Sequence, residues 1–294
     1  MFAHACNRAR QFTRPVIIST RFYDGSVSSG CGAFVVVNHE GWIVTVAHLW
    51  QSHHAAQAHA REIEDFKKRN AEIDADDSLT PKEKDAKKTA LSPNPKWITN
   101  SSFWWGCWNG ALLEDVRPLP EADLIVGRIE PFDPAWVSNY PVFKDPTRNF
   151  DQGTSLCRIG FPFHEIKTTF DAKKNSFVVD PVCLPPPHFP IEGIFTRNVL
   201  TGKTKDGKYD IKFIETSSPG LMGQSGGAIF DSHGTVWGIQ SRTKHLPLGF
   251  SPKIKRGNAE IEENQFLNVG VGIHAETILA FLKDNGISVQ LSVY

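Results

Sequence analysis

Glycines flank a serine in the segment Gly223-Gln224-Ser225-Gly226-Gly227, which runs directly into the apolar, strand-like residues 228–230. A serine between glycines can occupy a tight turn with its hydroxyl exposed, because glycine adopts backbone conformations that other residues avoid. Neighbouring backbone N–H groups are then free to point at a developing oxyanion. The segment therefore predicts a nucleophile at Ser225, although similar glycine-rich sequences also form ordinary flexible turns.

Two upstream strands carry residues that suit such a nucleophile. The apolar, β-branched run 41–47 predicts a buried strand that ends at His48, and a second apolar run, 124–129, directly follows Asp123. Taken alone, a histidine at a strand end is more often structural, and an aspartate before a strand is more often a turn residue. Together with Ser225, however, they have the residue types and chain order of a triad. In such a triad aspartate orients imidazole and imidazole takes the serine proton.

Five segments in order resemble the chymotrypsin-like (trypsin-like) serine proteases, and within them the HtrA-like and glutamyl-endopeptidase-like bacterial branch. The segments are 31–36 leading to 45–48, 122–126, 153–162, 223–230 with 234–239, and 271–279. The Gly160-Phe161-Pro162 step and the closing Val-Gly-Ile-His-x-Glu-Thr-Ile-Leu are the HtrA-like features. The resemblance spans about residues 15–285 apart from one insertion, and we expect no PDZ domain after it.

The resemblance implies an all-β fold of two six-stranded antiparallel β-barrels with a charged helical insertion and a C-terminal helix. Period-2 and apolar runs separated by turn residues also favour many short strands. The implied active site lies in the cleft between the barrels. The expected divisions are an N-terminal extension at 1–14, a first barrel with His48 and Asp123 at 15–135, a second barrel with Ser225 at 136–272, and a C-terminal helix and tail at 273–294.

The family pattern is interrupted between His48 and Asp123 by an insertion at about 51–96. Residues 53–91 are rich in Ala, Glu, Lys, Arg and Asp, and Thr80-Pro81-Lys82-Glu83 combines an N-cap, a proline at the first helical position and a capping-box glutamate. We expect two charged helices, near 53–74 and 81–91. The simple interpretation is a solvated helical hairpin. The alternative is a docking element for an activating partner, because the insertion begins beside His48.

The chemistry that the resemblance implies is acyl transfer by a serine endopeptidase. Ser225 attacks the peptide carbonyl, His48 accepts and then donates the proton, and Asp123 fixes the imidazole tautomer. The backbone N–H groups of Gly223 and Ser225 would form the oxyanion hole. This mechanism needs a protein or peptide substrate and requires neither a cofactor nor a metal. The spacings of His53, His54 and His59 also argue against a metal site in the insertion.

Substrate specificity is expected to depend on two stretches near Ser225. Trypsin-type enzymes carry an aspartate about six residues before the nucleophile, where this chain has Ser218-Pro219-Gly220, so cleavage after Lys or Arg is not supported. A strand at 240–243 resembles the edge that pairs with an extended substrate. We therefore predict a small, aliphatic or polar uncharged residue before the cut. The candidate pocket and edge residues are Pro219, Gly220, Gln240, Ser241, Arg242 and Thr243.

Composition limits the remaining classes. With 32 basic and 32 acidic residues the 294-residue chain gives no electrostatic case for an obligatory nucleic-acid partner. The first ten residues lack a signal peptide's apolar core, and no stretch is long enough to span a membrane, which predicts a cytoplasmic protein. The five cysteines are odd in number and widely spread. Cys31 and Cys157 are interpreted as small core residues, and the aromatic cluster at 97–108 as core or cleft wall.

Three functional hypotheses remain open on the sequence alone. The first is a regulated intracellular serine protease with an effector, stress or defence role. The second is a binding module that keeps the protease fold but has lost turnover, because an oxyanion loop can be inverted while every residue is present. The third is a viral-type processing protease, which the HtrA-like ending argues against.

Overall fold

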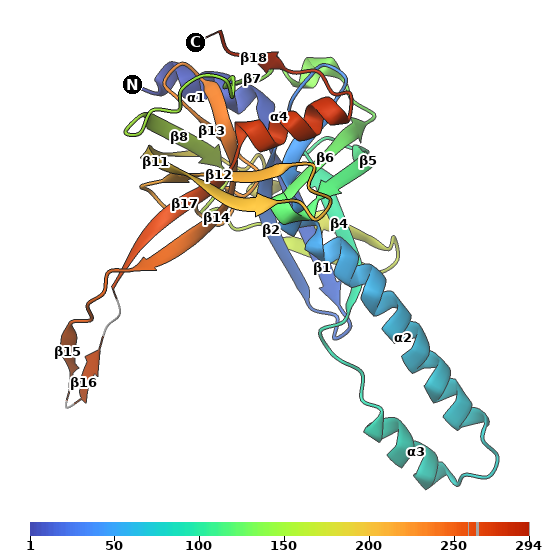
Figure 1. The fold of residues 1–294 in the computed structure, drawn as a ribbon. Helices are drawn as coiled ribbons and strands as arrows, with labels where there is room; N and C mark the ends of the chain where they lie inside the picture. Colours follow the sequence, from blue (N-terminus) through green and yellow to red (C-terminus); the bar gives the residue numbers. More distant parts are fainter. Residues whose placement is uncertain (258, 263–264, 294) are drawn as a thin grey trace.

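The computed structural model describes residues 1–257, 259–262 and 265–293 (Figure 1). Its residues 13–130, all of them described, contain six antiparallel strands in the sheet order β4-β1-β2-β3-β6-β5. The edge strands β4 and β5 contact each other, so the sheet curls into a barrel. The strands are β1 (Thr13–Phe22), β2 (Val27–Val36), β3 (Trp42–Val46), β4 (Ile98–Trp105), β5 (Leu112–Leu119) and β6 (Leu124–Glu130).

Among the described residues after 130, eight strands form a second sheet in the order β13-β8-β11-β12-β17-β14-β7-β18. Strand β13 also pairs with β14, which closes six of these strands into a second barrel and confirms the predicted fold of two six-stranded antiparallel barrels. Short strands β7 and β18 extend one edge in parallel. The eight are β7 (Val142–Phe143), β8 (Ser155–Gly160), β11 (Phe189–Lys203), β12 (Asp210–Thr216), β13 (Ala228–Phe230), β14 (Thr235–Pro247), β17 (Phe266–His274) and β18 (Gln290–Leu291).

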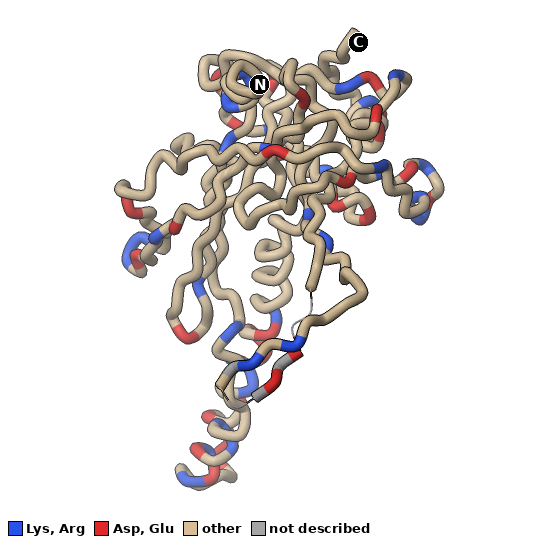
Figure 2. Tube along the Cα trace, turned by 90° about the vertical axis from the view of Figure 1, so that its left-hand side faces the viewer, with Lys and Arg blue, Asp and Glu red and all other residues tan. Residues whose placement is uncertain are grey.

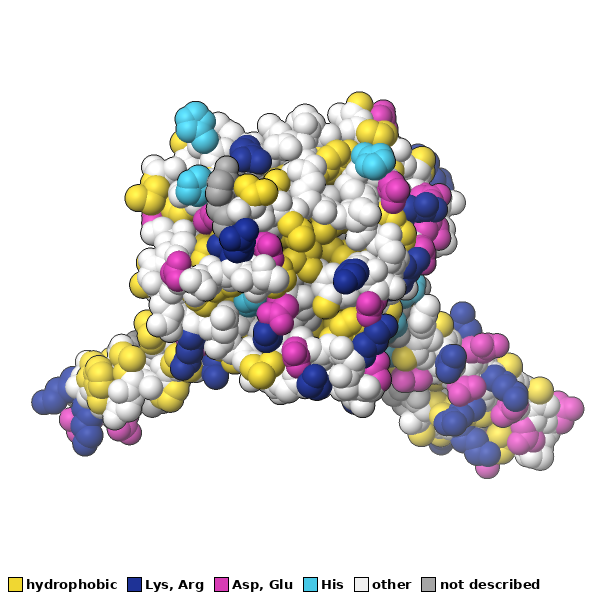
Figure 3. Space-filling model, turned by 45° about the horizontal axis from the view of Figure 1, so that its top comes forward, with side chains coloured by type: hydrophobic (Ala, Val, Ile, Leu, Met, Phe, Trp, Pro, Cys, Tyr) yellow, Lys and Arg dark blue, Asp and Glu magenta, His cyan; other side chains and the backbone are white. Residues whose placement is uncertain are grey.

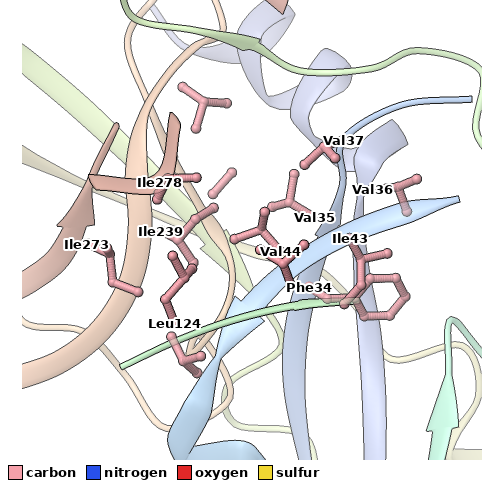
Figure 4. Packing of buried hydrophobic residues seen from close by; sticks show 14 of the residues in the cluster. Phe34, Val35, Val36, Val37, Ile43, Val44, Leu124, Ile239, Ile273 and Ile278 are labelled. Atoms are coloured by element: carbon pink, nitrogen blue, oxygen red, sulfur yellow. The ribbon is translucent and has the colours of Figure 1, made fainter. Parts of the chain in front are cut away.

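One hydrophobic core joins the two barrels. Every residue of β3 is buried, as its apolar, β-branched sequence predicts. Figure 4 shows Val44 of β3 and Leu124 of β6 beside Ile239 of β14, and all three belong to a single buried cluster. Because His48 follows β3 and Asp123 precedes β6, this packing fixes both residues relative to the second barrel.

The insertion forms the two helices that the sequence predicts, α2 (Gln51–Ala75) and α3 (Pro81–Ala90). Thr80 and Glu83 make the expected reciprocal capping box at the start of α3. Neither helix buries a residue, and α2 contacts the first barrel mainly along β4. The pair therefore projects from the barrels and carries a dense mixture of both charge signs (Figures 1 and 3).

The N-terminal segment is more ordered than the simple extension predicted at 1–14. Helix α1 (Ala3–Phe12) buries one face against the second barrel, and β1 already begins at Thr13. Its Cys6 sulfur lies 3.9 Å from the sulfur of Cys157 on β8. The buried positions Ala5, Ala9 and Phe12 recur at helical spacing, so the signal was present in a stretch interpreted only as polar and basic.

The C-terminal helix α4 (Ala275–Asp284) follows β17 as predicted, and the chain leaves it at Gly286, whose φ is +71°. A hairpin of β15 (Lys253–Arg256) and β16 (Ala259–Glu262) continues the β14–β17 ribbon away from the barrel, which the sequence analysis did not predict (Figure 1). A second hairpin pairs β9 (Thr168–Asp171) with β10 (Ser176–Val179). Short 3₁₀ turns are η1 (Ala47–Trp50), η2 (Pro120–Ala122), η3 (Pro134–Trp136) and η4 (Pro181–Cys183).

Acidic and basic residues are interspersed with each other along the described trace rather than separated by sign (Figure 2). Within the described part of the chain, no helix combines the length and the apolar character needed to cross a membrane.

Candidate active site

His48 and Asp123 meet because their strands are neighbours. Strands β3 and β6 pair antiparallel with Val46 opposite Leu124, so the residue after β3 lies beside the residue before β6. The Nδ1 atom of His48 lies 2.9 Å from Oδ2 of Asp123, and the His48 backbone N–H donates to Oδ1 at 2.9 Å. Asp123 itself adopts a left-handed conformation with φ +56°, which aims its carboxylate back at the imidazole.

A serine from the second barrel completes the environment of Asp123. The hydroxyl of Ser241 donates to Asp123 Oδ2 at 2.6 Å. Ser241 is the extra residue of a register shift between Gln240 and Arg242 on β14, and such a bulge re-aims a side chain. The sequence analysis had placed Ser241 only at the substrate edge, because no local pattern predicts a contact between residues so far apart in the chain.

The carboxylate of Asp123 is held in its ionised form. Burial alone would raise its pKa, but hydrogen bonds from His48 and Ser241 together lower the pKa below its usual value. An ionised carboxylate only accepts hydrogen bonds, so Nδ1 of His48 carries the hydrogen. Nε2 of the neutral imidazole is then left as a proton acceptor, which is the tautomer that a general base requires.

The turn around Ser225 needs each of its glycines. Gly223 has φ +94°, and a Cβ there would lie 2.5 Å from the Phe161 carbonyl oxygen. A Cβ on Gly226 would lie 1.9 Å from the Ala33 oxygen, and one on Gly227 would lie 2.0 Å from the Ile159 oxygen. These contacts are far below normal separations, so only glycine permits the chain to pass between the two barrels here.

The backbone of this turn leaves two donors pointing away from internal partners. The N–H groups of Gln224, Gly226 and Gly227 are each bonded within the protein, whereas those of Gly223 and Ser225 have no acceptor among the described residues. These are the two donors that the sequence analysis assigned to an oxyanion hole. The buried Gln224 side chain stabilises the loop, because its Oε1 accepts from Leu221 N–H at 3.0 Å and its Nε2 donates to the Phe189 oxygen at 3.3 Å.

Ser225 joins the other candidate residues through Ser241. The Ala33 N–H donates to the Ser225 carbonyl oxygen at 2.8 Å, which ties the turn to β2 of the first barrel. The Ser225 hydroxyl donates to the Ser241 carbonyl oxygen at 3.4 Å. Among the described contacts the hydroxyl makes no hydrogen bond to His48. The structure thus brings His48, Asp123 and Ser225 into one network, with the serine hydroxyl turned toward β14.

The predicted pocket residues lie on β14 and the loop before the nucleophile. Gln240 and Ser241 are buried, while the Arg242 guanidinium lies over the Phe213 ring at 4.6 Å. The Thr243 hydroxyl donates to the Gly220 carbonyl oxygen at 2.5 Å, which links the strand to the loop that continues from Pro219. These contacts place the two predicted stretches side by side.

A cleft of about 720 Å³ opens on the other side of the turn. Gly223, Met222 and Phe163 line it from the second barrel, and residues 27–31 of β2 line it from the first. Phe163 and Met222 are strongly exposed. The cleft begins at the candidate oxyanion donor Gly223, so a polypeptide bound there would pass directly beside Ser225.

The remaining nucleophiles and ligands do not form a second site of this kind. Burial raises the pKa of Cys31 to about 12 and that of Cys107 to about 11, so both remain thiols at neutral pH. Both pack against an apolar cluster, and Cys157 is buried in the main core. No group of His, Cys, Asp or Glu that could hold a metal occurs among the described residues. His59 instead accepts a hydrogen bond from the Ile98 N–H.

Comparison with known proteins adds a family match. A family model described as "Trypsin-like peptidase domain" matches residues 30–239, a range that contains His48, Asp123 and Ser225. A search of curated proteins found no match. Similar solved structures include an HtrA-type protease with a tripeptide, at 15% identity and a TM-score of 0.46, and with a decapeptide, at 14% and 0.46. The matches cover 97% of this chain but 63% and 68% of those chains.

Proposed function

Because the chain belongs to the trypsin-like peptidase family, we propose that it is a serine endopeptidase that uses His48, Asp123 and Ser225 as a catalytic triad. The observation that carries the proposal is the short contact between His48 Nδ1 and Asp123 Oδ2, made at the edge of the glycine turn that holds Ser225. This pair supplies an oriented base, and the turn supplies a nucleophile with two unpaired backbone donors beside it.

The reaction follows from these positions. The Ser225 hydroxyl turns from the Ser241 carbonyl toward His48 Nε2, which takes its proton as Ser225 Oγ attacks the peptide carbonyl carbon. The Gly223 and Ser225 N–H groups bind the oxyanion of the tetrahedral intermediate. His48 then donates the proton to the leaving amine, and an acyl-enzyme remains. Water, deprotonated by His48, hydrolyses the ester and regenerates the serine.

Peptide hydrolysis by point variants tests this assignment. In a quenched-fluorescent peptide assay, Ser225→Ala and His48→Ala should lower kcat by roughly 10⁵-fold or more, and Asp123→Asn by roughly 10⁴-fold, because each removes a group that acts only with the others. Ser232→Ala, in the turn after β13, serves as the matched serine control and should retain full activity. Turnover retained in Ser225→Ala would contradict the proposal.

A second candidate, a binding module without turnover, is favoured by one observation. The Ser225 hydroxyl is bonded to the Ser241 carbonyl oxygen rather than to His48. Such a protein would bind an extended peptide along β14 and the cleft at Gly223 without cleaving it. Peptide binding by fluorescence polarisation, with the wild type and Ser225→Ala giving the same affinity and the wild type giving no products, would favour this candidate over the protease.

We further propose that the protein acts inside the cell as a regulated protease, with an effector, stress or defence role, and that an activating partner docks on residues 51–96. All five cysteines are free thiols, and no disulfide joins Cys6 and Cys157 although their sulfurs are only 3.9 Å apart. Free thiols are typical of a reducing compartment. Alkylation of the protein in freshly lysed native cells should label five thiols after denaturation, whereas a protected disulfide would contradict this location.

A further inference from the structure

Arg158 is a buried cation inside the second barrel. It lies on β8, two residues after Leu156, and therefore on the same face of the strand, which points into the barrel interior. Its exposed fraction is 1%, and among the described residues it is the largest side chain that is fully buried. A full charge at this depth is unusual, because arginine is almost never completely buried unless it is paired.

Among the described residues the guanidinium has two hydrogen-bond partners, and both are neutral hydroxyls. Nη2 donates to the Thr216 hydroxyl and, at 3.2 Å, to the Ser218 hydroxyl. Nε and Nη1 are buried without an acceptor among the described residues. No carboxylate in the described part of the chain forms an ion pair with Arg158, whereas the neighbouring acid on β12, Glu215, is paired with Arg197.

The unpaired end of Arg158 lies against the predicted substrate pocket. A Cβ on Gly270 would lie 2.1 Å from Nη1, so the absence of a side chain there makes room for the guanidinium. Gly270 is bonded through its N–H to the Ser218 oxygen and sits opposite Thr243 on β14. Thr243 in turn holds Gly220. Arg158 thus lies directly behind the two stretches that the sequence assigned to specificity.

The charge persists despite burial. Desolvation lowers the pKa of Arg158 to about 10, which still leaves the guanidinium protonated at neutral pH. Within the described part of the chain, Cys157 is the ionisable group that acts on Arg158, and burial raises the pKa of that thiol, so it supplies no negative charge. An unneutralised buried charge is strongly unfavourable, and a carboxylate is the group whose geometry and charge best match a guanidinium.

We infer that Arg158 is the specificity-determining residue of this protease and that the enzyme cleaves after aspartate or glutamate, whose carboxylate pairs with the Arg158 guanidinium. This inference rests on the proposed endopeptidase function. It takes the place of the sequence-based prediction that the substrate residue before the cut is uncharged. That prediction considered only the pocket edge and loop. Arg158 lies 60 residues before Ser218 in the chain, and the contact between them appears only in the folded chain.

One competing ligand is an amide side chain. Gln240 donates from Nε2 to the Arg242 and Val271 oxygens, and its buried Oε1 has no partner among the described residues. A substrate glutamine offers an acceptor for Arg158 and a donor for Gln240. It cannot neutralise the guanidinium, however, so the charge argument favours glutamate. Because Glu and Gln side chains have nearly the same size, comparing the two substrates measures the effect of the negative charge alone.

Paired peptides that differ only in Glu or Gln before the cut test the inference by kcat/KM. The wild type should prefer Glu by about 100-fold or more, since Gln leaves the buried guanidinium without a counter-charge and an uncompensated buried charge is strongly unfavourable. Arg158→Met should bring the ratio close to one, and Arg158→Lys should keep part of it. Ser218→Asp, which supplies an internal counter-ion, should also abolish the preference, whereas Ser218→Asn should keep it. Arg148→Met, on an exposed arginine, is the matched control.

A binding experiment separates this inference from the proposed function. Ser225→Ala protein should bind the Glu peptide at least tenfold more tightly than the Gln peptide, and Arg158→Met in that background should remove the difference. If Ser225 in the wild type is catalytically inert but this binding difference holds, the protease proposal fails, whereas the proposal that Arg158 binds an acidic side chain stands. A wild type that cleaves Gln or aliphatic peptides as fast as Glu, or equal binding of both peptides, would overturn the inference.

Discussion

Ser241 connects the residues that the two barrels contribute to the site. Its hydroxyl donates to Asp123 and its carbonyl oxygen accepts from the Ser225 hydroxyl, so one residue of β14 contacts the carboxylate from the first barrel and the serine from the second. Because its hydrogen bond helps to lower the pKa of Asp123, Ser241 is a positioning residue that acts on the imidazole through the carboxylate.

Replacement of Ser241 by alanine should therefore lower kcat/KM by about 10- to 100-fold, while KM changes little. The acidic limb of the pH–rate profile reports protonation of the base His48. Without the Ser241 hydrogen bond the Asp123 carboxylate is more basic and favours the protonated imidazole beside it, so this limb should move to higher pH. Ser241→Thr, which retains the hydroxyl, should recover part of the rate. A pH profile identical to that of the wild type would show that Ser241 does not act through Asp123.

Single-residue roles could be predicted from the sequence where the signal is local. His48, Asp123 and Ser225 each stand at the boundary of an apolar strand or in a glycine turn, and those patterns are visible without the fold. The contacts of Ser241 with Asp123 and of Arg158 with Ser218 were not predictable. They join residues that are distant in the chain, and they depend on a β-bulge and on the closure of the second barrel.

Helix α4 has a pH-sensitive start. His274 is its N-cap and accepts a hydrogen bond from Glu276 N–H at 3.0 Å, which requires an unprotonated Nδ1. Burial lowers the pKa of His274 to about 4, and the nearby Glu276 opposes this shift only in part. The His274 imidazole is protonated near pH 6.5 in the unfolded chain but only near pH 4 in the folded chain. The stabilisation is thus complete above pH 6.5 and is lost as the pH falls toward 4.

Over that window the contribution of His274 to the free energy of unfolding should fall by roughly 3 kcal/mol. His274→Asn keeps a capping acceptor and removes the titration. Urea unfolding of both proteins at pH 7 and pH 4.5 should show a clearly larger loss for the wild type. Because all other titrating groups are shared, equal losses would contradict a buried neutral histidine at this cap.

The α3 capping box tests how independent the insertion is. Thr80→Ala should destabilise α3 by about 1 kcal/mol, because it removes one half of the reciprocal cap. Amide exchange in residues 81–90 should then accelerate several-fold, while the barrels' thermal midpoint stays unchanged, since α3 buries no residue. Thr89→Ala, inside the same helix, is the control. A lowered midpoint in Thr80→Ala would mean that α3 supports the barrels.

The sequence predicted some helices and strands closely and missed others, depending on how strong their local signals are. The start of α3 could be predicted closely because Thr80, Pro81 and Glu83 encode it locally. Helix α1 was missed although Ala5, Ala9 and Phe12 share one face, because small residues give a weak apolar signal. The β15–β16 hairpin was missed because residues 253–262 mix basic and acidic residues with few apolar ones, which gives little hydrophobic periodicity to detect.

At the scale of the whole molecule, the barrels form one core and the α2–α3 pair stands apart from it (Figure 1). Deletion of 55–90, with a short glycine–serine linker, should leave the thermal midpoint within about 4 °C of that of the full chain, because little buried surface is lost. We expect it to change protein-substrate turnover or assembly, because α2 begins directly after the turn that holds His48. Unchanged turnover, substrate choice and assembly would refute a regulatory role.

The central claim, that both barrels assemble a working triad at Ser225, is tested most directly by labelling with a fluorophosphonate, which reacts only with an activated serine. The wild type should be labelled at a single site that peptide mass mapping places at Ser225, and Ser225→Ala should be silent. The Ser232→Ala control should be labelled as fully as the wild type. Wild type that stays unlabelled, both purified and in native lysate, or labelling at another serine would contradict the account.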